Sequence, residues 1–188
     1  MNNNFKIESE RLILKILDES NGQEVLEYFI RNRDFLNKWE PIRQDEFYTL
    51  DNHMMQLKSE FEKIQEGRLF KVWVFEKEDK DFKNVLGSVA LNEIVRGCFH
   101  SCFLGYRMDS SKTNRGYITE AVRRVIKYAF DELKLHRIEA NIIPENGPSL
   151  RVVEKLGFYN EGLAIKYLKI NGKWEDHIHM VIRNEAME

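Results

Sequence analysis

The residues from Asp109 to Ala121 have the composition of a site that binds an anion. A strand-like run ends at Met108, a polar loop follows, and Gly116 opens a segment with helical periodicity. The start of a helix carries four unpaired N–H groups and the positive end of the helix dipole, which together attract a phosphate. Gly116 lets the backbone approach such a ligand closely, and Arg115 and Lys112 add positive charge. The same glycine would also suit a plain strand-to-helix turn, so the loop alone leaves both interpretations open.

Other candidate groups carry less chemistry. Cys98, His100 and Cys102 alternate along one strand-like segment, so all three could face the same way. A zinc site would need a fourth ligand or a water, and the sequence offers no second Cys/His cluster, so we expect no metal. His177 and His179 also alternate, and both substrate gating and surface exposure remain open for them.

The composition predicts a single globular domain spanning residues 1–188. The chain has 43% hydrophobic and 32% charged residues and a net charge of −2, which gives no overall basic field for nucleic acid or a membrane surface. The N-terminal segment has no apolar run typical of a signal peptide, and two cysteines cannot form a disulfide framework. We therefore expect a cytoplasmic protein that contacts neither membrane nor nucleic acid directly.

Hydrophobic periodicity predicts the order strand, two helices, three strands, helix, strand, helix, two strands. The predicted strands are Arg11–Leu17, Leu69–Phe75, Val85–Val95, His100–Met108, Arg137–Ile143 and a pair around the Asn171-Gly172 turn. The predicted helices are Gly22–Arg31, one from Thr49 to Gly67, Gly116–Leu133 and Ser149–Leu156. This order indicates an α/β (α+β) fold with one mixed, mostly antiparallel sheet and helices on both faces.

A family resemblance sharpens the interpretation of the loop. The stretch Gly116-Tyr117-Ile118-Thr119-Glu120-Ala121 looks like the Gly-Tyr-x-Thr-Glu-Ala stretch of the GNAT superfamily of N-acetyltransferases, in its ribosomal-protein-alanine branch. Further similar stretches occur in the same order along nearly the whole chain. They are Ser9-Glu10-Arg11-Leu12, Trp39-Glu40-Pro41, Val95-Arg96-Gly97, Leu104-Gly105-Tyr106, His136-Arg137-Ile138-Glu139-Ala140-Asn141, Leu156-Gly157-Phe158 and Gly172-Lys173-Trp174-Glu175-Asp176-His177.

The resemblance implies acetyl-CoA as co-substrate. The family's phosphate-loop signature, Gln/Arg-x-x-Gly-x-Gly/Ala, runs here from Thr113 to Ile118, and both of these residues depart from it. Because backbone N–H groups hold the phosphates, we expect weakened rather than lost binding. The residues implied in the loop are Thr113, Asn114, Arg115, Gly116, Tyr117, Ile118 and Thr119. On the preceding strand, the amides of Tyr106, Arg107 and Met108 are implied to hold pantetheine and the thioester.

The resemblance also suggests catalytic residues. Asn146 and Ser149 match an Asn-x-x-Ser pattern beside the cofactor's sulfur. Many relatives place a tyrosine acid four residues after this serine, where the chain has Val153, so Ser149 is the candidate that stabilises the leaving group. It would equally suit a helix cap.

The general base is less defined. Family members often carry a glutamate on the strand before the loop, where Phe103 stands in this sequence. Glu93 and Glu40 are the candidate substitutes, and a surface role for either, or a water chain in place of a base, remains open.

Three functions remain open from the sequence. The first is acetyl transfer from acetyl-CoA to the N-terminal alanine of a ribosomal protein, by direct attack of the amine without an acyl-enzyme. The second keeps the chemistry with a small amine, such as a polyamine, an amino acid or an antibiotic, and Glu40, Asp45 and Glu46 leave a polycationic acceptor open. The third is a non-catalytic acyl-CoA-binding module. Both a monomer and a homodimer are compatible with the sequence.

Overall fold

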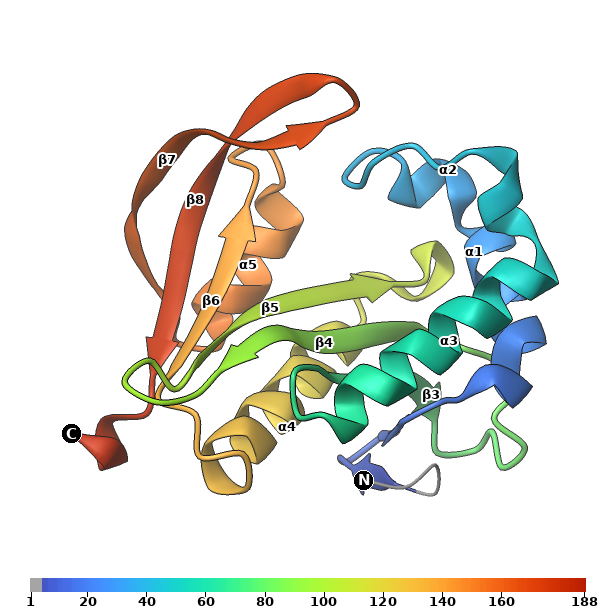
Figure 1. The fold of residues 1–188 in the computed structure, drawn as a ribbon, viewed down its shortest axis with the longest axis horizontal. Helices are drawn as coiled ribbons and strands as arrows, with labels where there is room; N and C mark the ends of the chain where they lie inside the picture. Colours follow the sequence, from blue (N-terminus) through green and yellow to red (C-terminus); the bar gives the residue numbers. More distant parts are fainter. Residues whose placement is uncertain (1–4) are drawn as a thin grey trace.

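The computed structural model describes residues 5–188. One open sheet contains eight strands in the order β1-β2-β3-β4-β5-β6-β8-β7 (Figure 1). The strands are β1 (Lys6–Glu8), β2 (Leu12–Lys15), β3 (Phe70–Glu76), β4 (Gly87–Val95), β5 (Ser101–Met108), β6 (Arg137–Ile142), β7 (Tyr159–Ile170) and β8 (Lys173–Arg183). The α-helices are α1 (Gly22–Arg31), α2 (Arg33–Leu36), α3 (Leu50–Gln65), α4 (Tyr117–Asp131) and α5 (Gly147–Lys155). Short 3-10 turns occupy Glu19–Asn21, Asp45–Tyr48, Ser110–Lys112 and Glu185–Met187.

The strand pairing makes the sheet mixed. Neighbouring strands are antiparallel, except that β5 and β6 run parallel. The predicted α/β class, with a mostly antiparallel sheet and helices on both faces, is confirmed (Figure 1).

The alternation of side chains along β3 separates two hydrophobic cores. Val72 and Val74 pack in one cluster with the apolar stripe of α4, including Val125. Trp73 and Phe75 pack in the other cluster with residues from α1 and α3. Because successive strand residues point to opposite faces, α4 and α5 cover one face of the sheet, here called the α4 face. The helices α1 and α3 cover part of the other, here called the α1 face.

Local signals in the sequence account for most of these elements. Thr49 caps α3 by accepting a hydrogen bond from the Asn52 amide (3.4 Å). The turn between β7 and β8 is formed by Asn171 and Gly172, whose φ angles are 50° and 84°, as the hairpin signal predicts. The apolar stripe of α4 buries its residues against the sheet, including Ala121 and Ala129.

Several boundaries differ from the prediction. The three-residue strand β1 was not predicted, because so short a segment has no readable alternation. The strand expected from Val85 begins at Gly87, and β7 begins at Tyr159, upstream of the predicted hairpin. In α3, His53 is buried whereas Met54 is 38% exposed.

Candidate active site

The strand β5 separates from β6 over half of its length. It pairs with β4 from Ser101 to Met108, whereas its pairing with β6 ends at Phe103, opposite Glu139. From Leu104 onward, β5 has no strand partner on its β6 side among residues 5–188, and the two ribbons diverge in Figure 1. We call this stretch, Leu104–Met108, the splay. Backbone N–H and C=O groups on such an edge are available to a ligand.

The three strand residues expected to bind pantetheine, Tyr106, Arg107 and Met108, all lie on the splay. Their side chains alternate, so Arg107 points to the α1 face and Tyr106 to the α4 face. Gly87 lets β4 approach closely here, because a Cβ at this position would lie 2.2 Å from the Arg107 carbonyl oxygen.

A pair of hydroxyl groups joins the splay to α5. The Tyr106 hydroxyl lies 2.6 Å from Ser149 Oγ and 2.9 Å from the Ser149 carbonyl oxygen. A carbonyl only accepts, so Tyr106 donates to it and the Ser149 hydroxyl then donates to the Tyr106 oxygen. Burial raises the pKa of Tyr106 to about 12, so this hydroxyl stays protonated at neutral pH.

The cap of α5 is Asn146 rather than Ser149. The Asn146 side chain accepts a hydrogen bond from the Ser149 amide (3.2 Å), which is the N-cap arrangement. The Ser149 hydroxyl is therefore free of capping and directed to Tyr106, so its alternative role as a helix cap is wrong.

The loop before α4 ends in an uncapped helix start. Gly116 occupies the N-cap position with φ 78° and offers no side-chain cap, and Asn114 is also left-handed with φ 60°. The first amide seen to bond within the helix is that of Glu120, to the Gly116 carbonyl (3.0 Å). The amides of the three preceding residues, Tyr117, Ile118 and Thr119, therefore suit an anion.

The charges around this helix start differ from the expectation. Lys112 is paired with Glu76 (3.0 Å), which also accepts a hydrogen bond from the Tyr117 hydroxyl (3.0 Å). Arg115 is exposed next to the uncapped amides, and the Arg11 guanidinium also lies beside Gly116.

Three signature residues use their side chains elsewhere. The Thr113 hydroxyl donates to the Ser110 carbonyl (3.1 Å), within the loop. The side chains of Tyr117 and Ile118 are partly buried against the core, and the Tyr117 hydroxyl also reaches Glu76. The large residue at position 118 is thus accommodated away from the amides.

The N-terminal motif fixes the start of α4. Glu120 accepts hydrogen bonds from the Ser9 hydroxyl (2.7 Å), the Arg11 amide (2.8 Å) and Arg11 Nε (2.7 Å). Burial would raise the pKa of Glu120, but these hydrogen bonds together hold it below its usual value. Arg11 Nη1 also donates to the Arg115 carbonyl (3.1 Å). The segment Ser9–Leu12 therefore positions the loop.

Asp109 anchors the other end of the loop. It is 4% exposed and accepts hydrogen bonds from Arg31 Nε (2.7 Å), Asn32 Nδ2 (3.0 Å) and the Ser111 hydroxyl (2.7 Å). Burial acts to raise the pKa of Asp109, but the hydrogen bonds outweigh it and lower the pKa to about 2. Asp109 thus joins α1 to the loop.

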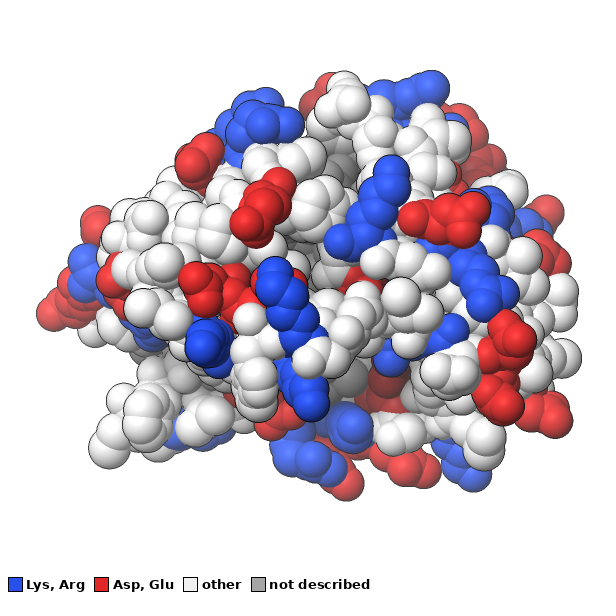
Figure 2. Space-filling model, turned by 90° about the horizontal axis from the view of Figure 1, so that it is seen from above, with Lys and Arg blue, Asp and Glu red and all other residues white. Residues whose placement is uncertain are grey.

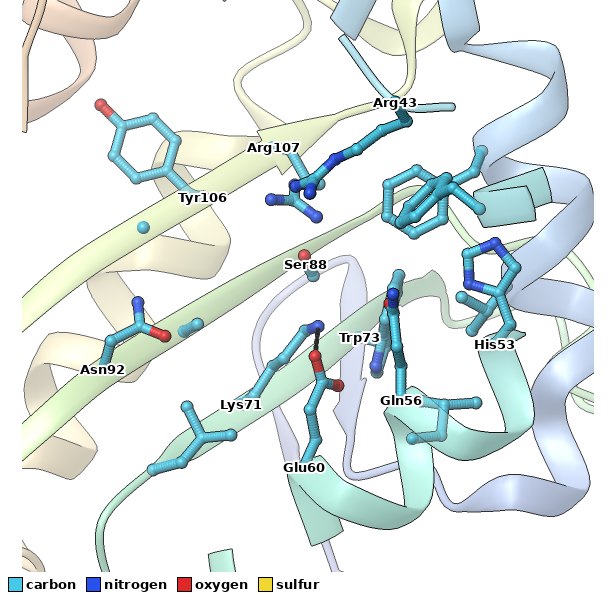
Figure 3. Close-up of a pocket in the computed structure, with 17 residues that line it drawn as sticks. Arg43, His53, Gln56, Glu60, Lys71, Trp73, Ser88, Asn92, Tyr106 and Arg107 are labelled. Carbon is cyan, nitrogen blue, oxygen red and sulfur yellow. Dashed lines mark hydrogen bonds and ion pairs between the residues drawn. The ribbon is translucent and has the colours of Figure 1, made fainter. Parts of the chain in front are cut away.

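On the α1 face, a polar cavity of about 220 Å³ reaches the splay at Gly105 and Arg107. Figure 3 shows Lys71 and Glu60 pointing toward one another across it, 2.6 Å apart and largely buried. Burial lowers the pKa of Lys71. His53 stacks on Phe29 with ring centroids 5.1 Å apart, and burial lowers its pKa to about 4, so it is neutral at pH 7.

The two candidate bases lie in different surroundings. Glu40 is 2.9 Å from Arg107 Nε, and the Glu40 side chain is 21% exposed. Glu93 is exposed, with φ 48° at a bulge between Asn92 and Val95, beside the paired end of β5. The structure therefore brings Glu40, but not Glu93, to the splay.

A bridge spans the α1 face above the splay. The Ile42 amide donates to Asn171 Oδ1 (2.7 Å), joining the segment after α2 to the β7–β8 turn. Figure 2 views the molecule from this end and shows basic and acidic side chains interspersed over the visible surface.

The alternating Cys98, His100 and Cys102 do not share a face. Cys98 lies in an exposed turn, whereas Cys102 is buried and its pKa is raised to about 12 by burial. Within residues 5–188, no group of three or more His, Cys, Asp or Glu side chains is placed to hold a metal ion. No helix in the described part of the chain is long and apolar enough to cross a membrane.

Sequence reasoning missed the roles of two side chains. It assigned only backbone amides to Tyr106 and Arg107, yet the first contacts Ser149 and the second contacts Glu40. Strand alternation could have predicted that the two side chains lie on opposite faces. Their partners, distant in the sequence, could not have been read from spacing.

Comparisons with known proteins agree with this geometry. A family model described as an acetyltransferase (GNAT) domain matches residues 11–159. The chain is 38% identical to the probable N-acetyltransferase YjcK of Bacillus subtilis, over 95% of this chain and 97% of that protein. It is 32% identical to the [ribosomal protein uS5]-alanine N-acetyltransferase of Escherichia coli, over 92% of this chain and 88% of that protein.

A solved structure is similar throughout. The ribosomal-protein-S5-alanine acetyltransferase from Vibrio fischeri superposes with a TM-score of 0.90 at 34% identity, covering 98% of this chain and 99% of that one. The family match covers most of the chain, and the splay and the uncapped helix start suit an acyl-CoA. The chain therefore belongs to the GNAT family and is an acetyl-CoA-dependent N-acetyltransferase.

Proposed function

We propose that the chain acetylates the N-terminal alanine of a ribosomal protein, and that the amine attacks the thioester directly. The observation that carries the proposal is the splay, which has the Tyr106–Ser149 hydroxyl pair on one face and the polar cavity on the other. The acetyl donor, acetyl-CoA, and the acceptor amine would thus meet in the splay from opposite faces of the sheet. The two similar proteins named as ribosomal-protein-alanine acetyltransferases support this acceptor, and such a reaction would take place in the cytoplasm.

The residues present fit acetyl-CoA. The uncapped amides of Tyr117, Ile118 and Thr119, with Arg115 beside them, would hold the pyrophosphate. The free edge of β5 at Tyr106–Met108 would hold the pantetheine, next to Asn146. When bound, acetyl-CoA supplies the activated acetyl group.

Ser149 is the residue proposed to assist the leaving group. With Tyr106 donating to the Ser149 carbonyl, the Ser149 hydroxyl donates to the Tyr106 oxygen. Rotation about the Ser149 Cβ–Oγ bond would turn this hydroxyl toward the sulfur of bound acetyl-CoA, and the Tyr106 hydroxyl could then donate to Ser149 Oγ. Each hydroxyl remains hydrogen-bonded in both arrangements, so the change leaves no buried donor unpaired.

Direct attack fits the cysteines of this chain. Cys102 is buried with a raised pKa, and Cys98 lies in the turn between β4 and β5 rather than on the splay. Neither thiol is placed to form an acyl-enzyme.

The charges of the cavity favour an α-amine over a polycation. Of the described residues that line it, Arg43, Lys71 and Arg107 are cationic and Glu60 is anionic. Glu40 is paired with Arg107, and Asp45 is paired with Arg33 (2.9 Å). A cationic environment lowers the pKa of an incoming amine, whose ordinary value is about 8, and so favours the neutral form that attacks.

A free amino acid is the second candidate acceptor. The excess of cations in the cavity, with Arg43 and Arg107 pointing toward one another, suits a carboxylate as well as a peptide carbonyl (Figure 3). The two acceptors differ in the group attached to the first residue's carbonyl carbon, which is a peptide nitrogen in one and a free carboxylate oxygen in the other. The experiment can vary this group directly.

The test is a thiol-release assay with acetyl-CoA against three acceptors: a peptide beginning with alanine, free alanine and spermidine. The same peptide with an N-terminally blocked alanine is the control. We expect turnover of the free peptide and none of the blocked one. Turnover of free alanine alone would select the second candidate, and turnover of spermidine alone would contradict both. Binding of acetyl-CoA without turnover of any amine would indicate a binding module.

A further inference from the structure

A histidine and an asparagine lie side by side on the strands next to the splay. Asn141 of β6 is in register with His179 of β8, so their side chains share a face. His179 Nδ1 is 3.1 Å from Glu139 Oε1, and Glu139 is also held by Arg137 (2.8 Å). A carboxylate beside one ring nitrogen fixes the proton on that nitrogen. His179 is therefore oriented, and in the neutral ring its Nε2 is the hydrogen-bond acceptor.

Two atoms of this cluster are buried without a hydrogen-bond partner in the described part of the chain. They are His179 Nε2 and Asn141 Oδ1. The Asn141 Nδ2 group already donates to the Tyr167 hydroxyl (3.3 Å), which leaves the carbonyl oxygen unpaired. An unpaired buried polar atom costs about 1–3 kcal/mol, and a hydrogen bond from a ligand would remove this cost. Both atoms are acceptors, so the complementary ligand is a group with several N–H donors.

The cluster lies on the α1 face of the sheet. Ile138, Ala140 and Ile142 of β6 are buried in the core with α4, so the intervening Glu139 and Asn141 face the other way, as Arg107 does. Pairing between β5 and β6 ends at Glu139. Asn141 is thus two residues beyond the point where the strands separate, at the edge of the splay.

We propose that His179, oriented by Glu139, accepts the proton of the acceptor amine, while Asn141 Oδ1 accepts a hydrogen bond from a second N–H of the same nitrogen. This inference rests on the proposed function and supplies its general base. The amine nitrogen forms a bond to the acetyl carbon, and the carbon–sulfur bond breaks with its electron pair on sulfur. The amine proton passes to His179 Nε2, and Ser149 donates a hydrogen bond to the departing sulfur.

The tyrosine of the hairpin covers this cluster. The Tyr167 ring lies 4.7 Å from the His179 ring and 5.6 Å from the His177 ring, measured between centroids. His177 Nδ1 is 3.1 Å from the Glu175 carbonyl oxygen, so its ring already has a partner within β8. His179 is the imidazole of this pair with a buried, unpartnered nitrogen.

The test compares His179→Ala with His136→Ala, a partly exposed histidine that pairs with Glu188 outside this cluster. We expect His179→Ala to lower kcat for the peptide about 10²-fold with the KM for acetyl-CoA unchanged, and His136→Ala to leave both unchanged. Added imidazole should restore part of the rate of His179→Ala only, because a small base can enter the space left by the ring. Asn141→Ala should raise the KM for the acceptor about fivefold, the effect of one lost hydrogen bond.

The pH profile adds a readout that a purely structural role would not move. The acid limb of kcat/KM should change in His179→Ala, and Glu139→Gln should change it in part. The titratable and charged groups around His179 are Arg137 and Glu139 on β6, Tyr167 and Glu161 on β7, and His177 on β8.

Two results would overturn the inference alone. One is turnover of the peptide by His179→Ala at more than a third of the wild-type rate. The other is a loss of rate that tracks a loss in Tm and is not rescued by imidazole. Adding the acceptor amines while following the ¹⁵N signal of His179 Nε2 separates failure of this inference from failure of the proposed function. If no amine is turned over and none shifts that signal, both the proposed function and the role of His179 are contradicted. A shift without turnover would support binding of the amine at His179 and would contradict only the proposed function.

Discussion

The two faces of the splay differ in how completely their polar atoms are paired. On the α4 face, the hydroxyls of Tyr106 and Ser149 satisfy one another, and Asn146 caps the helix that carries the serine. On the α1 face, His179 Nε2 and Asn141 Oδ1 are buried and unpaired within residues 5–188. The polar atoms on the α4 face are thus paired within the chain, whereas these two atoms on the α1 face could accept hydrogen bonds from a ligand.

This difference predicts that substitutions on the leaving-group side separate cleanly into catalytic and structural ones. Ser149→Ala should lower kcat about 10²-fold with little change in Tm, because the serine does not cap α5. Asn146→Ala should instead cost about 1 kcal/mol of stability. Steady-state kinetics and thermal unfolding of both variants provide the measurement. Equal losses of stability in the two would contradict the separation.

The buried Asp109, which joins α1 to the loop before α4, predicts a contribution to stability that is lost in acid. The pKa of Asp109 is about 2 in the folded chain, below its ordinary value of 3.8, so its stabilisation is present above pH 4 and is lost as the pH falls toward 2. Asp109→Asn should lower the free energy of unfolding by about 2 kcal/mol at pH 7. Urea unfolding at several pH values measures the difference, which should shrink below pH 4. A constant difference across that range would exclude the ionised carboxylate as its cause.

Tyr106 should matter less than Ser149, because it acts through the serine. Tyr106→Phe removes the hydroxyl that holds Ser149 Oγ and should lower kcat about tenfold, which corresponds to about 1.4 kcal/mol. The KM for the acceptor should not change, because the hydroxyl lies on the opposite face. A combined Tyr106→Phe, Ser149→Ala variant should be no slower than Ser149→Ala alone. Additive losses would show that the two hydroxyls act independently.

The smallest expected effect lies on the acceptor side, at His53. Burial lowers its folded pKa to about 4, below the usual 6.5, so the unfolded chain takes up the proton first as the pH falls from 6.5. The free energy of unfolding should therefore decrease as the pH falls below 6.5, by about 0.7 kcal/mol between pH 7 and 6. His53→Leu should remove this contribution to the slope, measured as the change in unfolding free energy. If the variant shows the same dependence of the unfolding free energy on pH, this dependence comes from groups other than His53.

Local signals allowed much of the framework to be predicted. Gly116 marks the start of α4 and Asn171-Gly172 the hairpin turn because these positions require φ angles that glycine and asparagine adopt readily. The resemblance correctly indicated the family and the co-substrate. The register of β5 could not be predicted, because the point where it leaves β6 depends on packing between distant segments.

The side-chain partnerships were harder to predict for the same reason. Tyr106 meets Ser149 and His179 meets Glu139 across separations of about 40 residues, and no local pattern encodes those contacts. Lys112 shows the same limit: its position in the loop suggested added charge for a phosphate, and the structure also pairs it with Glu76 from β3. The position of a residue in the sequence predicts the element it lies on, but not which side chain of a distant element will pair with it.

The bridge between Ile42 and Asn171 joins two segments that lie 129 residues apart in the sequence through one hydrogen bond between exposed groups. A hydrogen bond of this kind contributes about 1 kcal/mol, so it can open and close without unfolding either segment. Asn171→Ala removes the side-chain acceptor and should leave Tm nearly unchanged. Steady-state kinetics of this variant with the alanine peptide would then measure what the contact contributes to access of the acceptor.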